Sequence, residues 1–122
     1  MRRRILLVED NPQNRYLVTF LLEKNGYEVV VAEDGEEALA MLASRTPDLI
    51  LMDMQLPKLD GYEATRRIKA NEDYRDIPLV ALTAHSMKGD RGKAIDAGCD
   101  EYVTKPVDAE GLVALIERLL PE

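Results

Sequence analysis

Four charged side chains, Glu9, Asp10, Asp53 and Lys105, each follow a short run of strand-forming residues. The three runs are residues 5–8, 49–52 and 101–104. If these runs are parallel strands of one sheet, three carboxylates and one ammonium meet at its carboxyl edge. Clustered carboxylates repel one another, so such a group needs a divalent cation or raised pKa values. The pattern therefore indicates a metal site at which one carboxylate performs chemistry.

The chemistry that suits these residues is phosphoryl transfer. Mg²⁺ prefers carboxylate oxygens, keeps several waters and accepts phosphate oxygens. Asp53 ends an apolar strand, where rigid backbone would hold its carboxylate for attack on phosphorus to form an acyl phosphate. The cation and Lys105 would neutralise charge on the transferring group, and the hydroxyl of Thr83, at the end of another apolar run, could donate a hydrogen bond to it.

Each of these residues has an ordinary explanation when it is considered alone. Glu9 and Asp10 as an isolated pair are typical of a solvated strand end, and Lys105 of an exposed lysine. Thr83 by itself is equally well explained as a β-favouring residue of a strand. It is the coincidence of all of them at strand ends that favours a functional site.

The elements that would position these side chains alternate in type along the chain. Apolar and valine-rich runs predict strands at residues 5–8, 28–32, 49–53, 79–83 and 101–104. Helices are predicted after Asn11-Pro12 up to Asn25-Gly26, after Asp34, over 62–70, up to Ala97 before Gly98, and after Asp108. Residues 84–90 are predicted to form a polar loop, so the start of the fourth helix is left open.

Apolar residues recur at helical spacing in four of these helices. The first helix carries Tyr16, Leu17, Phe20 and Leu21, with Lys24 at the same spacing. Buried stripes are predicted at Ala38, Leu39, Met41 and Leu42, at Ala64, Thr65 and Ile68, and at Leu112, Leu115, Ile116 and Leu119.

Five strand–helix units with short connections predict an α/β fold, a doubly wound five-stranded parallel sheet covered by helices on both faces. Two strand orders are common for such sheets, and for five strands we favour 2-1-3-4-5, the flavodoxin-like (βα)5 arrangement. That order makes strands 1 and 3 neighbours, which would bring Asp10 and Asp53 face to face. No linker or repeat interrupts the pattern, so we expect one domain over residues 1–122.

Composition limits the classes of partner and compartment. The formal charge of −7 argues against nucleic acid or an anionic membrane as partner. No stretch approaches the roughly 20 apolar residues of a membrane-spanning helix. The single cysteine, Cys99, cannot form an internal disulfide, which fits a reducing compartment. We therefore expect a cytoplasmic protein.

Taken together, the motifs resemble those of the receiver domain of two-component response regulators, over essentially the whole chain. They are Glu9-Asp10-Asn11, Asp53 within residues 51–57, Asp60-Gly61, Thr83-Ala84 and Lys105-Pro106. Each motif is short, but their order and spacing together are specific. The segment 84–99 is similar to stand-alone receivers of cell-cycle type and to receivers attached to hybrid kinases.

The resemblance implies a metal-dependent phosphoacceptor switch. Asp53 would accept the phosphoryl group, and Mg²⁺ would be bound directly by Asp10, Asp53 and the backbone carbonyl of Gln55. Glu9 would act mostly through water. These assignments follow from the family pattern, residue by residue.

The same resemblance implies how the switch is read. Thr83 and Lys105 would bind the phosphoryl group. Tyr102 would occupy the aromatic switch position, whose side chain turns inward when the threonine moves toward the phosphate. The side chains of Gln55, where many receivers have Asn, and of His85 would tune dephosphorylation. The surface expected to change comprises the fourth helix, the fifth strand and the fifth helix.

The implied partners are a sensor histidine kinase or phosphotransfer protein and a downstream protein target, for a monomer or weak dimer that is not itself an enzyme. Three alternatives differ in identifiable residues. A flavodoxin-like cofactor site needs a hydroxyl- and glycine-rich loop where Glu9 stands. A metal-dependent phosphatase needs a carboxylic acid at Gln55. A docking-only receiver would be expected to lack part of the acidic cluster, Thr83 or Lys105, and all are present.

Overall fold

Five strands and five helices alternate along the part of the chain that the computed structural model describes, residues 2–56, 60–83, 88–105 and 108–120. The strands are β1 (Arg4–Val8), β2 (Glu28–Ala32), β3 (Leu49–Asp53), β4 (Leu79–Thr83) and β5 (Glu101–Thr104). The helices are α1 (Pro12–Lys24), α2 (Gly35–Ser44), α3 (Gly61–Ala70), α4 (Lys88–Ala97) and α5 (Ala109–Leu119).

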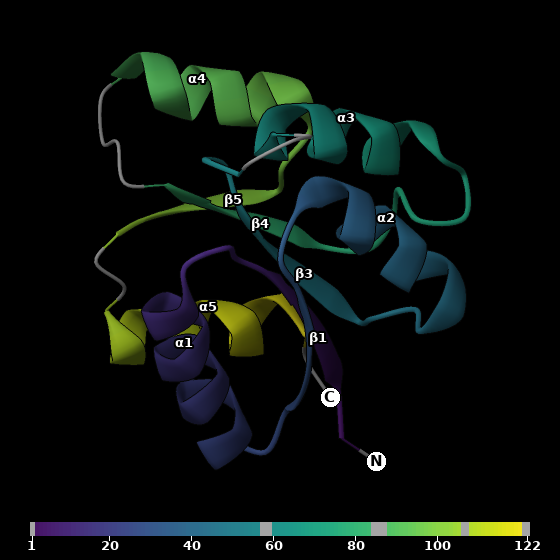
Figure 1. Ribbon diagram of the computed structural model, residues 1–122. Helices are drawn as coiled ribbons and strands as arrows, with labels where there is room; N and C mark the ends of the chain where they lie inside the picture. Colours follow the sequence, from purple (N-terminus) through teal and green to yellow (C-terminus); the bar gives the residue numbers. More distant parts are fainter. Residues whose placement is uncertain (1, 57–59, 84–87, 106–107, 121–122) are drawn as a thin grey trace.

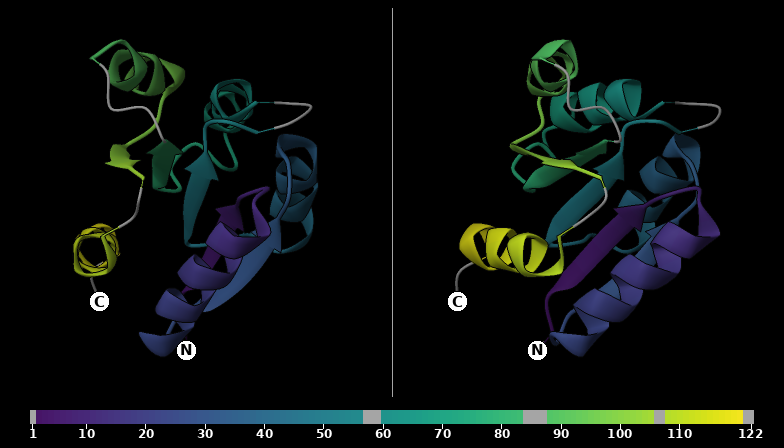
Figure 2. Two further views of the ribbon diagram at one scale, coloured as in Figure 1. Left: turned by 60° about the vertical axis from the view of Figure 1, so that its left-hand side comes forward. Right: turned by 90° about the vertical axis from the view of Figure 1, so that its left-hand side faces the viewer.

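All strand pairs are parallel, and the order β2-β1-β3-β4-β5 confirms the predicted topology. Helices α1 and α5 cover one face of the sheet, and α2, α3 and α4 cover the other (Figures 1 and 2). Strands β1 and β3 lie next to each other, with Val8 paired to Met52. The chain segments that follow these two strands therefore emerge side by side at one edge.

The apolar runs are explained by burial of the central strands on both faces. Every residue of β3 and β4 is buried. Because side chains alternate across a strand, one set packs under α2, α3 and α4 and the other under α1 and α5. The rigid core thus reaches up to Asp53 and Thr83, the last residues of their strands.

Polar residues cap the helix starts, at Asn11, Asp34 and Asp108 as predicted and also at Asp60. Asn11 Oδ1 accepts hydrogen bonds from the backbone N–H groups of Gln13 (2.9 Å) and Asn14 (3.1 Å). Asp34, Asp60 and Asp108 each accept one from the third residue after them. Such caps contribute about 1 kcal/mol each. The Asn11 cap fixes the turn between β1 and α1, directly after Glu9 and Asp10.

Two predictions about helices need correction. In α1 the buried residues are Val18 and Leu22, whereas Tyr16, Leu17 and Phe20 are exposed. Apolar residues occupy more than one face of this helix, so spacing alone did not identify the face that packs on the sheet. Helix α4 begins at Lys88, inside the segment predicted to be a loop.

The buried stripes of the other helices are confirmed. Ala38, Leu42, Ala64, Thr65, Ile68, Leu112 and Ile116 are buried, and Leu39, Met41, Leu115 and Leu119 are partly buried against the core.

Cys99 lies at the junction between α4 and β5. Gly98 adopts a positive φ of 111°, which ends the helix, and the N–H of Cys99 donates to the carbonyl of Ala94 at 3.2 Å. The Cys99 side chain is buried in the core on the α2, α3 and α4 side. Burial raises the pKa of its thiol to about 11.

Gly61, the first residue of α3, packs directly against the end of β3. A Cβ atom there would lie 2.6 Å from Cα of Met54 and would overlap the carbonyl oxygen of Asp53. We predict that Gly61→Ala lowers the free energy of unfolding by about 1–3 kcal/mol, the usual cost of overpacking. Urea denaturation measures the change.

The matched control is Gly92→Ala in α4, where an added Cβ would meet nothing within 4 Å. This change should stabilise the protein by about 0.5–1 kcal/mol, because alanine is the better helix former. Equal unfolding free energies for the two variants would contradict the close packing at Gly61.

Candidate phosphoryl-transfer site

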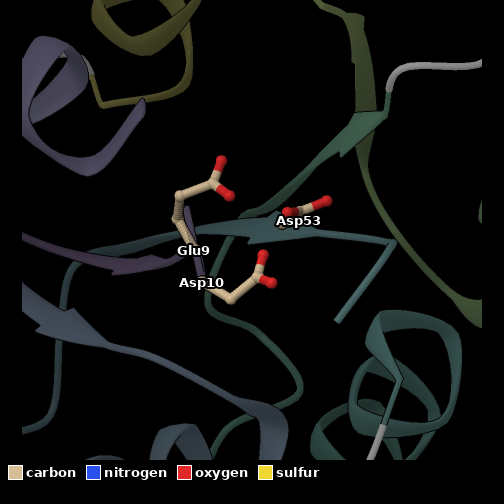
Figure 3. Close-up of side chains that lie close together, drawn as sticks. All are labelled: Glu9, Asp10 and Asp53. Carbon is tan, nitrogen blue, oxygen red and sulfur yellow. The ribbon is translucent and has the colours of Figure 1, made fainter. Parts of the chain in front are cut away.

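Three carboxylates converge where β1 and β3 end. Glu9, Asp10 and Asp53 each offer an oxygen within 4.8 Å of the others, and Figure 3 shows the three side chains turned toward a common space. Glu9 is 1% exposed and Asp53 2% exposed, whereas Asp10 is exposed. The pairing of β1 with β3 accounts for this convergence.

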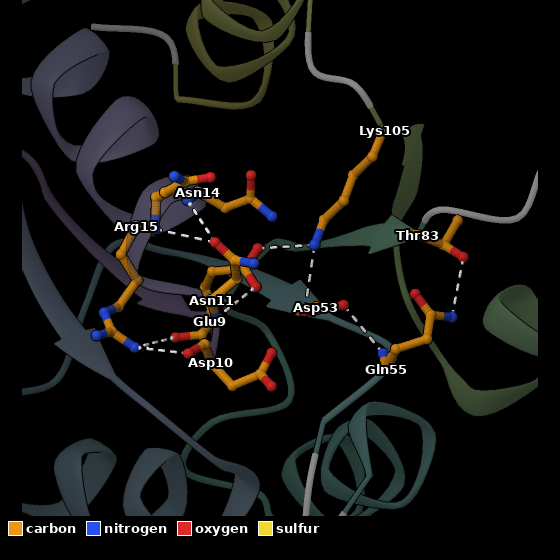
Figure 4. Close-up of polar contacts among 10 residues, drawn as sticks. Glu9, Asp10, Asn11, Asn14, Arg15, Asp53, Gln55, Thr83 and Lys105 are labelled. Atoms are coloured by element: carbon orange, nitrogen blue, oxygen red, sulfur yellow. Dashed lines mark hydrogen bonds and ion pairs between the residues drawn. The ribbon is translucent and has the colours of Figure 1, made fainter.

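Lys105 places its ammonium between two of these carboxylates. Its Nζ lies 2.8 Å from Glu9 Oε1 and 3.2 Å from Asp53 Oδ2 (Figure 4). The backbone supports this placement, since the N–H of Lys105 donates to the carbonyl of Thr83 at 2.7 Å. The lysine predicted from the end of the fifth strand therefore contacts the acidic group directly.

The carboxylates are also held by backbone groups of their own loops. The N–H of Asn11 donates to Glu9 Oε2 at 3.2 Å, and the N–H of Gln55 donates to Asp53 Oδ1 at 2.9 Å. These bonds fix the directions of both buried carboxylates. They also satisfy oxygens that would otherwise be costly to bury.

Sequence reasoning missed Arg15. Its Nη1 donates to the backbone carbonyls of Glu9 (3.1 Å) and Asp10 (3.0 Å), which ties the first turn of α1 to the loop after β1. The only signal in the sequence was its place one turn after the Asn11 cap. That position lets a long side chain reach back to the strand end.

The metal-free site is electrostatically unbalanced. Burial, together with the neighbouring Asp53, raises the pKa of Glu9 from 4.5 to about 7, even though Lys105 acts in the opposite direction. For Lys105, burial acts to lower the pKa, but the hydrogen bond to Glu9 and the charges of Asp53 and Glu9 outweigh it and raise the pKa. The three carboxylates together therefore carry more negative charge than Lys105 neutralises.

This donor set fits Mg²⁺. The ligands are hard carboxylate oxygens, and the exposure of Asp10 leaves room for the waters that Mg²⁺ retains. The buried Asp53 and Glu9 complete one side of such a site.

Thr83 and Tyr102 lie on the β4 and β5 side of this edge. The buried hydroxyl of Thr83 accepts a hydrogen bond from Nε2 of Gln55 at 3.1 Å. Tyr102 pairs with Ala81 across the strands and packs, partly buried, against the core on the α2, α3 and α4 side. Tyr102 is thus beside the Thr83 strand, as predicted, but it is not part of the acidic group. His85 lies outside the described residues.

The chain matches the model of the response regulator receiver domain over residues 5–117. It is 40% identical, over 98% of both chains, to the polar-differentiation response regulator DivK of Brucella ovis. The receiver domain of the Pseudomonas aeruginosa sensor histidine kinase PA1611, solved with magnesium in its active-site cleft, is 41% identical with a TM-score of 0.91 over 98% of both chains.

The chemotaxis response regulator CheY4 of Vibrio cholerae is 28% identical, with a TM-score of 0.92 over 98% of this chain and 100% of that one.

Within the part of the chain that is described, no helix has the length and apolar character needed to cross a membrane.

The raised pKa of Glu9 predicts a characteristic pH dependence of stability in metal-free protein. Between the ordinary pKa of 4.5 and about 7, folded protein holds a proton on Glu9 that unfolded protein releases. The free energy of unfolding should therefore fall as pH rises through this window. Glu9→Gln removes this titration, so the wild type should lose on the order of 3 kcal/mol relative to the variant.

Urea denaturation at several pH values in chelator measures this difference. Glu72→Gln, at an exposed position, is the control and should follow the wild-type curve. A constant difference between wild type and Glu9→Gln from pH 5 to 8 would contradict the raised pKa.

Proposed function

The chain belongs to the response regulator receiver domain family, the signalling switches of two-component phosphorelays, and we propose that Asp53 is the side chain that carries the phosphoryl group. The observation that supports this most directly is the position of Asp53. It is a buried carboxylate on rigid strand backbone, with an ammonium 3.2 Å away and two further carboxylates beside it. Neither Glu9 nor Asp10 combines burial at a strand end with contacts to both Lys105 and the β3–α3 loop.

The proposed reaction forms and breaks one bond at phosphorus. A carboxylate oxygen of Asp53 attacks the phosphorus of a phosphohistidine or a small acyl phosphate, giving an aspartyl phosphate. The bond between phosphorus and the donor breaks, and its electron pair leaves with the donor group. Lys105 neutralises charge on the transferring oxygens, and the Thr83 hydroxyl donates to one of them once it turns toward the group.

We assign the Mg²⁺ ligands to Asp10, Asp53 and the backbone carbonyl of Gln55, with Glu9 acting through water. When bound, the cation neutralises charge on the phosphoryl oxygens. The chain's own contribution is to hold these oxygens in place through the Asn11 and Gln55 backbone bonds. Burial and the neighbouring Asp53 raise the pKa of Glu9 in the metal-free site, and a bound cation would favour its charged form.

A receiver exchanges phosphoryl groups with a histidine kinase or phosphotransfer protein and acts on downstream targets. For this chain we propose that movement of Thr83 is followed by Tyr102 and changes the surface formed by α4, β5 and α5. The partial burial of Tyr102, on a strand paired with β4, supports this coupling. We further propose a monomer or weak dimer that acts through proteins rather than nucleic acid and that is not an enzyme in its own right. The role of His85 in dephosphorylation stays a prediction.

Asp53→Asn should abolish phosphorylation, because an amide is a poor nucleophile. Incubation with radiolabelled acetyl phosphate and Mg²⁺, followed by intact-mass analysis, tests this. Asp76→Asn, at an exposed position before β4, is the control and should label like wild type. Wild-type labelling of the Asp53 variant would reject the assignment.

Labelling should also require the cation. Excess chelator should reduce acetyl phosphate labelling of the wild type to the level of Asp53→Asn, because the single ammonium of Lys105 does not offset the charge of three carboxylates facing the incoming phosphate. Added Mg²⁺ should restore it. If labelling persists at the same rate in chelator, the metal role is wrong.

A further inference from the structure

Gln55 contacts both the proposed phosphoacceptor and the proposed switch residue. Its backbone N–H donates to Asp53 Oδ1 at 2.9 Å, and its side-chain Nε2 donates to Thr83 Oγ1 at 3.1 Å. Figure 4 shows the Gln55 side chain extending from the Asp53 loop to the Thr83 hydroxyl. One residue therefore connects the ends of β3 and β4 through two separate hydrogen bonds.

The backbone of Thr83 is fixed, so a response of this residue must come from its side chain. Its carbonyl accepts from the N–H of Lys105 at 2.7 Å, and Thr83 pairs with Thr104 of β5. On the other side, the N–H of Met54 bonds to the carbonyl of Leu82 at 2.9 Å. The hydroxyl can change its position by rotation about χ1.

The side chains of Thr83 and Asp53 lie on opposite faces of the sheet. Thr83 follows the alternation of Leu79 and Ala81, which pack on the α2, α3 and α4 side. Asp53 follows Leu49 and Leu51, which pack on the α1 and α5 side. To meet a phosphoryl group on Asp53, the Thr83 hydroxyl must turn away from the position in which it accepts from Gln55.

We propose that the Gln55 side-chain amide is a latch that holds the Thr83 hydroxyl in its resting position and opposes its movement toward the phosphoryl group. The inference rests on the proposed function of Asp53 and Thr83. Gln55 acts here as a positioning residue, through Thr83. A glutamine can do this because its side chain is long enough to span the gap between the two strand ends.

The consequence is that the latch stabilises only the resting state. Its loss should favour the state that binds a phosphoryl group. A single neutral hydrogen bond at an exposed side chain corresponds to a change of about three- to tenfold in an equilibrium constant. Gln55→Met keeps the length of the side chain and removes its donor.

A double-mutant cycle on beryllofluoride binding with Mg²⁺ tests the latch, with affinity measured by calorimetry on the full chain. Gln55→Met should tighten binding about three- to tenfold in a chain with Thr83, and should have no effect when combined with Thr83→Val. Gln13→Met makes the same chemical change on α1, on the other face of the sheet, and should leave affinity unchanged.

A second readout is the NMR signal of the Thr83 methyl group, which reports its rotamer. In ligand-free Gln55→Met this signal should move toward its position in beryllofluoride-bound wild type. An unmoved signal, or the same change in affinity with and without Thr83→Val, would overturn the latch alone. Failure of the wild type to bind beryllofluoride, like Asp53→Asn, would overturn the proposed function and the latch with it.

Discussion

Repulsion among Glu9, Asp10 and Asp53 is the constraint around which this edge of the sheet is organised. Their oxygens lie within 4.8 Å of one another, and two of the three side chains are almost fully buried. Only one ammonium, that of Lys105, contacts the group among the described residues. The arrangement is tolerable because backbone N–H groups orient the buried oxygens and because Glu9 can remain protonated near neutral pH. A group held in this way suits a divalent cation, which would offset its negative charge.

The rest of the fold provides the rigidity that such a group requires. Strands β1 and β3 bring the carboxylates together only because they are neighbours in the sheet, and both are buried by helices on each face. Lys105 arrives from β5, two strands away from β3, and its backbone is bonded to the end of β4. The site thus joins four of the five segments that leave the carboxyl edge, and contacts of Lys105 and Gln55 connect Asp53 to the ends of β4 and β5.

Much of this could be predicted from sequence, because burial and capping leave direct signals. Apolar and valine-rich runs marked most of the strands, and Asn11, Asp34 and Asp108 marked helix starts by their side-chain chemistry. The buried face of α1 could not be predicted, because apolar residues occupy more than one face of that helix, and which of them pack depends on the neighbouring sheet. Side-chain contacts at the strand ends, such as Arg15 with the β1 end and Gln55 with Thr83, could not be predicted either, since they depend on rotamers set by the assembled fold.

Cys99 gives this molecule an internal reporter. It is the only thiol in the chain, it is buried at the α4–β5 junction, and its pKa of about 11 keeps it protonated at neutral pH. A thiol reagent can therefore modify it only when that junction opens, so the alkylation rate measures local opening rather than intrinsic reactivity. The junction leads into β5, which carries Tyr102 and ends directly before Lys105. Alkylation of this one native sulfur atom would thus report local opening next to β5 without any introduced label.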